Sequence, residues 1–287
     1  MRCEWLEIFI RIDPIAFEAV GAHMFDLGCE GVVTEDSGLR AYLSVQGVPG
    51  GVQDCVRDIL DRVRESFPEI APPRSEIKGI EAEDWALNWR RYFRPQRVTK
   101  KLLVLPAWEP VPEEGGGCVI RMDPGPAFGT GQHPTTKMCL RAMEESPLSR
   151  SWTMMDVGTG SAILAIYAAK LGARPILALD VDSEALRWAH VNIALNGLSG
   201  AIRLSSQPVE SCSERFSMVA ANLTLDIILE LFPHFPRLVE PGGRLILSGI
   251  LGGQVAELEK PLEESGLVQC SVLHEEEWAA LVAQKFD

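Results

Sequence analysis

The residues whose types and spacing could bind a ligand are concentrated in the stretch that ends at Asp180. Asp156 precedes a turn that contains Gly158 and Gly160, and Asp180 ends the apolar run that follows. Glycines let a ligand come close to the backbone, and a helix that begins after them offers unpaired backbone N–H groups. A carboxylate at the position of Asp180 can accept two hydrogen bonds from a ribose diol. This pattern predicts a binding site for a nucleoside.

A strand, a helix and a second strand must hold these residues in place. The segment from Ala162 to Leu171 carries apolar residues at helical spacing, and Gly172 is a fitting C-terminal cap. The apolar run from Ile176 to Leu179 is typical of a short buried strand. One such βαβ unit predicts a parallel sheet with a right-handed crossover. In sheets of this kind ligands bind at the carboxyl ends of the strands.

Two ligand classes are compatible with this unit. The dinucleotide fingerprint G-x-G-x-x-G/A requires a small residue where this chain has Ile163. The form Asp156-x-Gly158-x-Gly160 is instead typical of methyltransferases that bind S-adenosylmethionine, in which the acid fixes the turn and no pyrophosphate has to be held. A purely structural turn between a strand and a helix is the remaining alternative.

A second candidate ligand-binding segment is the loop DPGPAFGTGQHPTT, from Asp123 to Thr136. Ordering a loop so rich in glycine and proline costs conformational entropy, which favours a ligand-binding role over a passive connection. A helix is expected from Lys137 to Glu145, capped by Thr135 or Thr136. A lone histidine such as His133 more often makes structural hydrogen bonds, so no catalytic role is assigned to it.

Composition limits the class of protein. The chain has 287 residues, of which 46% are hydrophobic and 23% charged, as expected for one large globular domain or two of ordinary size. The net charge of -13 disfavours nucleic acid as a direct partner and suits a basic one. Charges interrupt the N-terminal stretch MRCEWLEIFIRID, so neither a signal peptide nor a membrane span is expected. Seven cysteines and five histidines are scattered, which predicts reduced thiols, no metal site and a cytoplasmic location.

The N-terminal part has the pattern of a small separate domain. Trp5 to Ile12 alternates as a strand, and Asp13-Pro14 opens a helix. Two short strands follow, and then an amphipathic helix from Val52 to Phe67. With a final strand near Ser75 to Ile80, this order is that of a ferredoxin-like split βαβ fold. The proline-rich segment from Pro68 to Pro73 marks the boundary.

The segment from Glu83 to Pro95 places aromatic residues beside arginines. We expect a helix whose aromatic side chains pack against the next domain. The chain therefore divides into a small domain at residues 1–70, a linker with a helix at 71–97, and an α/β domain at 98–287 that contains the glycine turn.

The C-terminal third supplies one further candidate site residue, Asn222, which follows the apolar run Met218 to Ala221. We expect this strand to end opposite the glycine turn. A helix is expected from Gly252 to Ser265, and a closing strand over HEEEWAALVAQKF, from His274 to Phe286.

With these segments placed, the chain resembles the ribosomal protein L11 methyltransferases over nearly its whole length. The segments that carry the resemblance are EDWALNWRRYFRPQRV, DPGPAFGTGQHPTT, DVGTGSAILAIYAAKLGA, LDVDSEALRWAHVNIALNG, AANLTLDIILEL and EPGGRLILSGIL. The glycine turn alone is common to many methyltransferases. The loop FGTGQHPTT together with the tryptophan- and arginine-containing segment is much more specific.

The resemblance implies a seven-stranded Rossmann-like methyltransferase domain of the α/β class, preceded by a small α+β ferredoxin-like domain that recognises the substrate. It implies S-adenosyl-L-methionine as cofactor and methylation of L11, a basic protein, on lysine side chains and on the N-terminal α-amine. A cytoplasmic monomer is expected. Carried over by position, the cofactor-binding residues are Phe128, Thr136, Gly158, Gly160, Asp180 and Asn222. The resemblance also implies that Phe128 helps to enclose the cofactor. We expect Asn222 and the backbone around Leu223 to accept hydrogen bonds from the substrate amine and to orient it.

Three positions depart from the family's pattern. Ala162 stands where a third glycine is usual, Thr159 where a cysteine or similar residue is usual, and Gln132 where a threonine is usual. We expect the methyl group of Ala162 to tighten the turn. Two alternatives stay open: a related methyltransferase acting on another protein, such as an electron-transfer flavoprotein subunit, or on a small molecule; and a cofactor-binding, ribosome-associated module that has lost catalysis.

Overall fold

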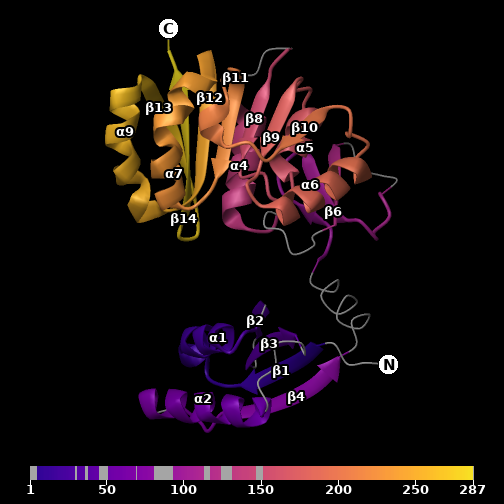
Figure 1. The fold of residues 1–287 in the computed structure, drawn as a ribbon, viewed down its shortest axis with the longest axis vertical. Coiled ribbons are helices and arrows are strands. Elements are labelled where there is room, and N and C mark those ends of the chain that lie inside the picture. Colours follow the sequence, from indigo (N-terminus) through magenta and orange to yellow (C-terminus); the bar gives the residue numbers. More distant parts are fainter. Residues whose placement is uncertain are drawn as a thin grey trace. The chain divides into compact units, whose positions relative to one another are not determined.

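The computed structural model describes residues 5–29, 31–35, 38–44, 51–68, 70–80, 93–112, 117–123, 131–146 and 151–286. The chain forms two compact units, Met1–Tyr92 and Phe93–Asp287. Figure 1 shows the first in indigo to purple and the second from magenta to yellow. Most of the predicted linker helix, residues 83–92, lies outside the described residues.

The described strands of the first unit form a four-stranded antiparallel sheet in the order β2-β3-β1-β4. The central strand β1 pairs with both β3 and β4, and its alternate residues Ile8 and Ile10 are fully buried, as the sequence alternation predicts. The sheet extends into the segment that the sequence assigned to the linker, because its last strand ends at Ile80. The strands are β1 (Trp5–Arg11), β2 (Gly31–Glu35), β3 (Gly38–Ser44) and β4 (Arg74–Ile80).

Two helices, α1 (Phe17–Asp26) and α2 (Val52–Ser66), complete the core of this unit. A short 3-10 helix, η1 (Pro14–Ala16), precedes α1, and the Asp13 side chain caps it by accepting a hydrogen bond from the Ile15 N–H at 3.1 Å. The expected helix start at Asp13-Pro14 is therefore confirmed. One apolar face of α2 is buried, as its period predicts; this face is made by Val56, Ile59, Leu60 and Val63.

The second unit begins with a three-stranded sheet of β5 (Gln96–Arg97), β6 (Leu102–Pro106) and β7 (Cys118–Met122). Strands β6 and β7 are parallel. The chain is described again from Gly131, just before α4 (Pro134–Glu145).

The described residues of the second unit also form a seven-stranded sheet in the order β10-β9-β8-β11-β12-β14-β13. The strands from β10 to β12 are parallel, and β14 and β13 close the sheet with antiparallel pairings. The predicted α/β class with a large parallel sheet is confirmed. The strands are β8 (Met154–Val157), β9 (Ile176–Leu179), β10 (Ile202–Ser205), β11 (Phe216–Asn222), β12 (Val239–Leu251), β13 (Leu267–Glu275) and β14 (Trp278–Lys285).

Helices cover both faces of this sheet, because successive strand residues point to opposite faces. Along β9, Ile176 and Ala178 belong to one apolar core, and Leu177 and Leu179 belong to the other. The first core is completed by α4, α5 (Ile163–Lys170) and α6 (Ser183–Leu195). The second is completed by α7 (Leu225–Leu231), η4 (Phe232–His234), α8 (Phe235–Leu238), η5 (Gly252–Leu258) and α9 (Glu259–Ser265).

The strand order reverses next to β8. The chain moves outward from β8 through β9 to β10 and then returns to β11 on the other side of β8. Ligands of open α/β sheets bind at such a reversal, outside the carboxyl ends of the strands. The ends of β8 and β11 are therefore the expected walls of a site.

Three sequence expectations differ from the structure. The strand β10 was not predicted, because IRLS carries only two apolar residues. The expected helix from Gly252 to Ser265 is a 3-10 helix followed by α9. The expected closing strand is two strands, because Glu276 adopts a positive φ of 55° and turns the chain between β13 and β14. No described helix is long and apolar enough to cross a membrane.

Gly38→Ala should lower the free energy of unfolding by about 1–3 kcal/mol. A Cβ at this position would lie 2.2 Å from the Ile10 carbonyl oxygen. Gly21→Ala in α1 is the matched control, since its Cβ would meet side-chain atoms only at 3.9 Å and alanine is favoured inside a helix. Urea unfolding of both variants checks the prediction. A Gly38→Ala protein as stable as wild type would contradict the close approach of β1 and β3.

Candidate functional site

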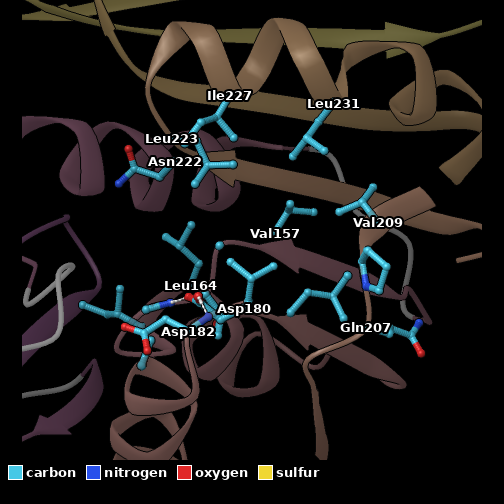
Figure 2. A pocket seen from close by; sticks show the side chains of 18 of the residues that line it. Val157, Leu164, Asp180, Asp182, Gln207, Val209, Asn222, Leu223, Ile227 and Leu231 are labelled. Atoms are coloured by element: carbon cyan, nitrogen blue, oxygen red, sulfur yellow. Dashed lines mark hydrogen bonds between the residues drawn. The ribbon is translucent and has the colours of Figure 1, made fainter. Parts of the chain in front are cut away.

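A cavity of about 680 Å³ lies at the carboxyl edge of the seven-stranded sheet, beside the reversal of strand order. Its walls are the glycine turn after β8, the end of β9 with the start of α6, the segment after β10, the end of β11, and α7 (Figure 2). Five of the six predicted cofactor-binding residues line it: Thr136, Gly158, Gly160, Asp180 and Asn222. The sixth, Phe128, lies outside the described residues.

The glycine turn depends on left-handed backbone conformations. Gly158 and Gly160 have φ of 69° and 51°, which glycine adopts without steric cost. A Cβ at Gly158 would lie 2.4 Å from the Leu223 Cδ2, so any larger residue there would displace the Leu223 side chain. Ala162 also has a left-handed φ, 67°, at the N-cap of α5. Its methyl group therefore does more than tighten the turn, because it makes this conformation costly.

The buried carboxylate of Asp156 holds the glycine turn in place through hydrogen bonds. Its side chain is 1% exposed, and Oδ2 accepts hydrogen bonds from the Thr159 hydroxyl at 2.6 Å and the Ala165 N–H at 3.2 Å. Burial raises the pKa of Asp156 to about 6, while these two hydrogen bonds act in the opposite direction. The sequence-based expectation that this acid holds the turn is confirmed.

Asp180 joins the turn to the cavity. Its Oδ2 accepts a hydrogen bond from the Gly160 N–H at 2.9 Å, and its Oδ1 accepts one from the Asp182 N–H at 3.0 Å. Each carboxylate oxygen can accept a further hydrogen bond. Figure 2 shows Asp180 beside Leu164 on the cavity wall opposite α7. The carboxylate is thus held by the backbone and has acceptor capacity for a diol.

Asn222 stands at the end of β11, where the strand reaches the cavity. Its Nδ2 donates to the Thr136 Oγ1 at 3.3 Å, and its Oδ1 is buried and has no hydrogen-bond partner among the described residues. A buried amide oxygen without a partner costs free energy, so this atom needs a donor. An incoming amine could supply that hydrogen bond.

Thr136 does not cap α4, contrary to expectation. The N-cap is His133, whose ring nitrogen accepts from the Thr135 N–H at 3.4 Å, and the helix begins at Pro134. Pro134 fits the first helical position, so the N-cap is the residue before it, His133. His133 also stacks edge-on against Trp278 at 4.9 Å, and burial lowers its pKa. These contacts give His133 a structural role, as expected.

A bulge in β12, which is not predicted from the sequence, brings Leu223 to its place at the cavity. The Leu223 N–H donates to the Ser248 carbonyl at 2.9 Å. The next residue, Gly249, has φ of 89°, and a Cβ there would lie 2.3 Å from the Leu223 carbonyl oxygen. The register of β12 with β14 shifts at this point. A glycine inside a strand is itself a sign of a bulge or of close backbone approach.

Apart from Leu223, the residues at the roof and at the far end of the cavity are not predicted from the sequence. Leu223, Ile227 and Leu231 face the cavity from the α7 side, and Gln207 and Val209 line the end opposite Asn222 (Figure 2). Two apolar residues that line the cavity are largely exposed, Ile227 at 43% and Val181 at 85%. Exposed apolar side chains in a cavity wall suit contact with an apolar ring of a ligand.

Among the described residues, no lysine or arginine lines the cavity. The five carboxylates of the lining favour a cationic ligand. These are Asp180, Asp182, Glu184, Glu210 and Glu230. No group of histidine, cysteine, aspartate and glutamate residues suited to a metal ion was found among the described residues.

The sequence was compared with known families. The sequence model of one family, described as ribosomal protein L11 methyltransferase (PrmA), matches residues 4–286. This chain belongs to that family. The L11 methyltransferase of Geotalea daltonii is 33% identical over 307 residues, which span 98% of each protein. That of Pelotomaculum thermopropionicum is 35% identical over 305 residues, 98% of this chain and 99% of the relative.

A solved structure supports the same assignment. The ribosomal protein L11 methylase of Lactobacillus delbrueckii subsp. bulgaricus is 32% identical, with a TM-score of 0.63. The match covers 68% of this chain and 100% of that one. The similarity to this family thus extends to the fold.

The cofactor of this methyltransferase family is S-adenosylmethionine, and the cavity fits it. The volume of the cavity lies within the range of about 300–1,000 Å³ that is usual for small-molecule and cofactor sites. The Asp180 carboxylate matches a ribose diol, and the exposed apolar pair suits an adenine. The anionic lining matches a ligand whose net charge is positive.

Gly249→Ala should weaken cofactor binding, because the added Cβ displaces Leu223 and with it Asn222. We expect the affinity to fall about tenfold, because a loss of about one or two kcal/mol of binding free energy corresponds to a factor of that size. Calorimetric titration with S-adenosylhomocysteine measures it. Gly253→Ala is the matched control, since no atom lies within 4 Å of its Cβ. Equal affinity of the two variants would contradict the positioning role of the bulge.

Proposed function

We propose that this protein transfers methyl groups from S-adenosylmethionine to amines of ribosomal protein L11, both lysine side chains and the N-terminal α-amine. The observation that carries the proposal is the cavity at the strand-order reversal, where an anionic nucleoside-type site meets an unpaired amide oxygen at Asn222. Membership in the L11 methyltransferase family supports the substrate.

Residues of the chain would hold the cofactor along the length of the cavity. Asp180 would accept hydrogen bonds from the ribose hydroxyls, and the backbone at Gly158 and Gly160 would lie against the ligand. Val181 and Ile227 would flank the adenine. The bound cofactor supplies an electrophilic methyl group on a positively charged sulfur. Catalysis then depends on aligning an amine with that methyl group, which is an effect of proximity and orientation.

The substrate amine must reach the cavity uncharged. A lysine amine has a reference pKa of about 10.4, and an apolar environment such as the Leu223 side wall lowers it. We propose that the proton leaves to solvent, and that Asn222 Oδ1 accepts a hydrogen bond from the neutral amine. That bond would aim the nitrogen lone pair and pair the buried amide oxygen.

The charge of the protein supports a basic partner. Its net charge of -13 would steer a cationic substrate protein toward it at low salt. We propose that the first unit, with its four-stranded antiparallel sheet, recognises L11. We also propose that the linker expected at 71–97 begins only after β4, which belongs to that sheet. We further propose that the enzyme acts as a monomer in the cytoplasm.

Incubation with labelled S-adenosylmethionine and the ribosomal proteins of the same cell tests the function. The proposal predicts label on L11, and mass mapping would locate it on lysines and on the N-terminal amine. Label on a different protein would assign another protein substrate. Cofactor binding without transfer to any ribosomal protein would contradict the proposal and favour a non-catalytic module.

Asn222→Ala should reduce turnover at saturating cofactor by about 100-fold, since misplacing a reacting group by about 1 Å has an effect of this size. Cofactor affinity should change far less. Gln207→Ala, at the opposite end of the cavity, is the matched control and should weaken binding while leaving saturated turnover near wild type. Equal losses of turnover and affinity in Asn222→Ala would eliminate its orienting role.

A further inference from the structure

A buried asparagine outside the cavity connects two of the segments around it. Asn192, on α6, is 0% exposed. Its Nδ2 donates to the Ser161 carbonyl oxygen at 3.2 Å, and its Oδ1 accepts from the Asp123 N–H at 2.7 Å. One side-chain amide therefore connects the glycine turn to Asp123, the residue directly after β7. Asn192 itself does not line the cavity.

The bond to Ser161 acts on the one strained residue of the turn. The Ser161 carbonyl and the Ala162 N–H belong to the same peptide unit, and the Ala162 N–H donates to the Thr159 carbonyl oxygen at 2.8 Å. Hydrogen bonds at both ends thus fix the plane of this peptide. Its orientation sets φ of Ala162, which is 67°. A residue with a Cβ is disfavoured there, whereas glycine is not.

The conformation of Ala162 matters for the cavity because α5 begins directly after it. Ala162 is the N-cap of α5, is 0% exposed, and makes no side-chain capping bond. If it relaxed to a right-handed conformation, the turn with Gly158 and Gly160 would rotate relative to the helix. Both glycines line the cavity, so the site would change shape.

We propose that Asn192 is a positioning residue for cofactor binding, which holds the turn of residues 158–162 in its binding shape against the left-handed strain at Ala162. The inference rests on the proposed function, because it takes the cavity to be the S-adenosylmethionine site. It predicts that the need for Asn192 depends on which residue occupies position 162. A glycine there removes the strain and hence the need for the bond.

Asn196, the C-cap of α6 four residues after Asn192, provides a matched control. Its Oδ1 accepts from the Arg121 N–H at 3.0 Å, and its Nδ2 donates to the Arg121 carbonyl at 2.7 Å. It therefore attaches the end of α6 to β7, near the residue that Asn192 contacts, but among the described residues its side chain makes no hydrogen bond to the glycine turn. Loss of Asn196 removes a structural contact without releasing Ala162.

The experiment measures the affinity for S-adenosylhomocysteine by calorimetry in five proteins. These are wild type, Asn192→Ala, Ala162→Gly, the double variant and Asn196→Ala. Asn192→Ala should bind about tenfold more weakly, which is the effect expected for one strained residue. The double variant should return to near wild-type affinity, and Ala162→Gly alone should bind like wild type. Asn196→Ala should keep its affinity even if its melting temperature falls.

Recovery of affinity in the double variant is the decisive readout. If Asn192 had only a general structural role, glycine at position 162 would not restore the affinity that Asn192→Ala loses. If Asn192→Ala does not fold, Asn192→Asp replaces it, because the carboxylate can still accept from Asp123 but cannot donate to Ser161. A double variant as weak as the single one, or an equal loss in Asn196→Ala, would overturn the inference. A wild-type protein that binds no cofactor would instead overturn the proposed function.

Discussion

The hydrogen bond from the Gly160 N–H to the Asp180 carboxylate is the interaction on which the site depends. It joins the turn after β8 to the end of β9, two adjacent parallel strands. The acid can take this place only because the sheet is parallel, so that both strands present their carboxyl ends to the same edge. The Gly160 N–H donates to this carboxylate from a turn in which both Gly158 and Gly160 adopt a positive φ. The Asp180 carboxylate thus both holds the glycine turn and lines the cavity.

The same constraint explains why the remaining site residues come from distant parts of the chain. Asn222 ends β11, which lies on the other side of β8 from β9. Gly249 lies in β12, the next strand outward, and lets Leu223 approach closely enough to cover Gly158. The cavity is therefore assembled by strand order, and β8, β9 and β11 contribute the residues at their carboxyl ends, Val157, Leu179 and Asn222.

Much of this site could be predicted from the sequence because its central part is local. Asp156, Gly158, Gly160 and Asp180 fall within one βαβ unit, in which spacing alone indicates the geometry. Asn222 was recognised from the end of an apolar run. The parallel α/β architecture followed from the same pattern, and the structure confirms it.

The rest depends on contacts that spacing does not encode. Ile227 and Gln207 reach the cavity only through the packing of α7 and through the short strand β10, which has a weak apolar signal. His133 replaces a threonine as the helix cap because Pro134 takes the first helical position. The left-handed conformation of Ala162 runs against residue preference and is visible only in coordinates. The free-energy cost of this conformation implies a compensating interaction. The buried Asn192 side chain supplies a hydrogen bond to the peptide between Ser161 and Ala162.

The most direct test of the account compares two ligands on two proteins. Wild type and Asp180→Ala are titrated with S-adenosylhomocysteine and with its 2′,3′-dideoxy analogue. If Asp180 holds the ribose diol, removing the hydroxyls should weaken binding to wild type by about tenfold or more, the size expected for hydrogen bonds to a charged group. The same removal should have little effect on Asp180→Ala. Equal losses in both proteins would contradict the assignment of this cavity as the cofactor site.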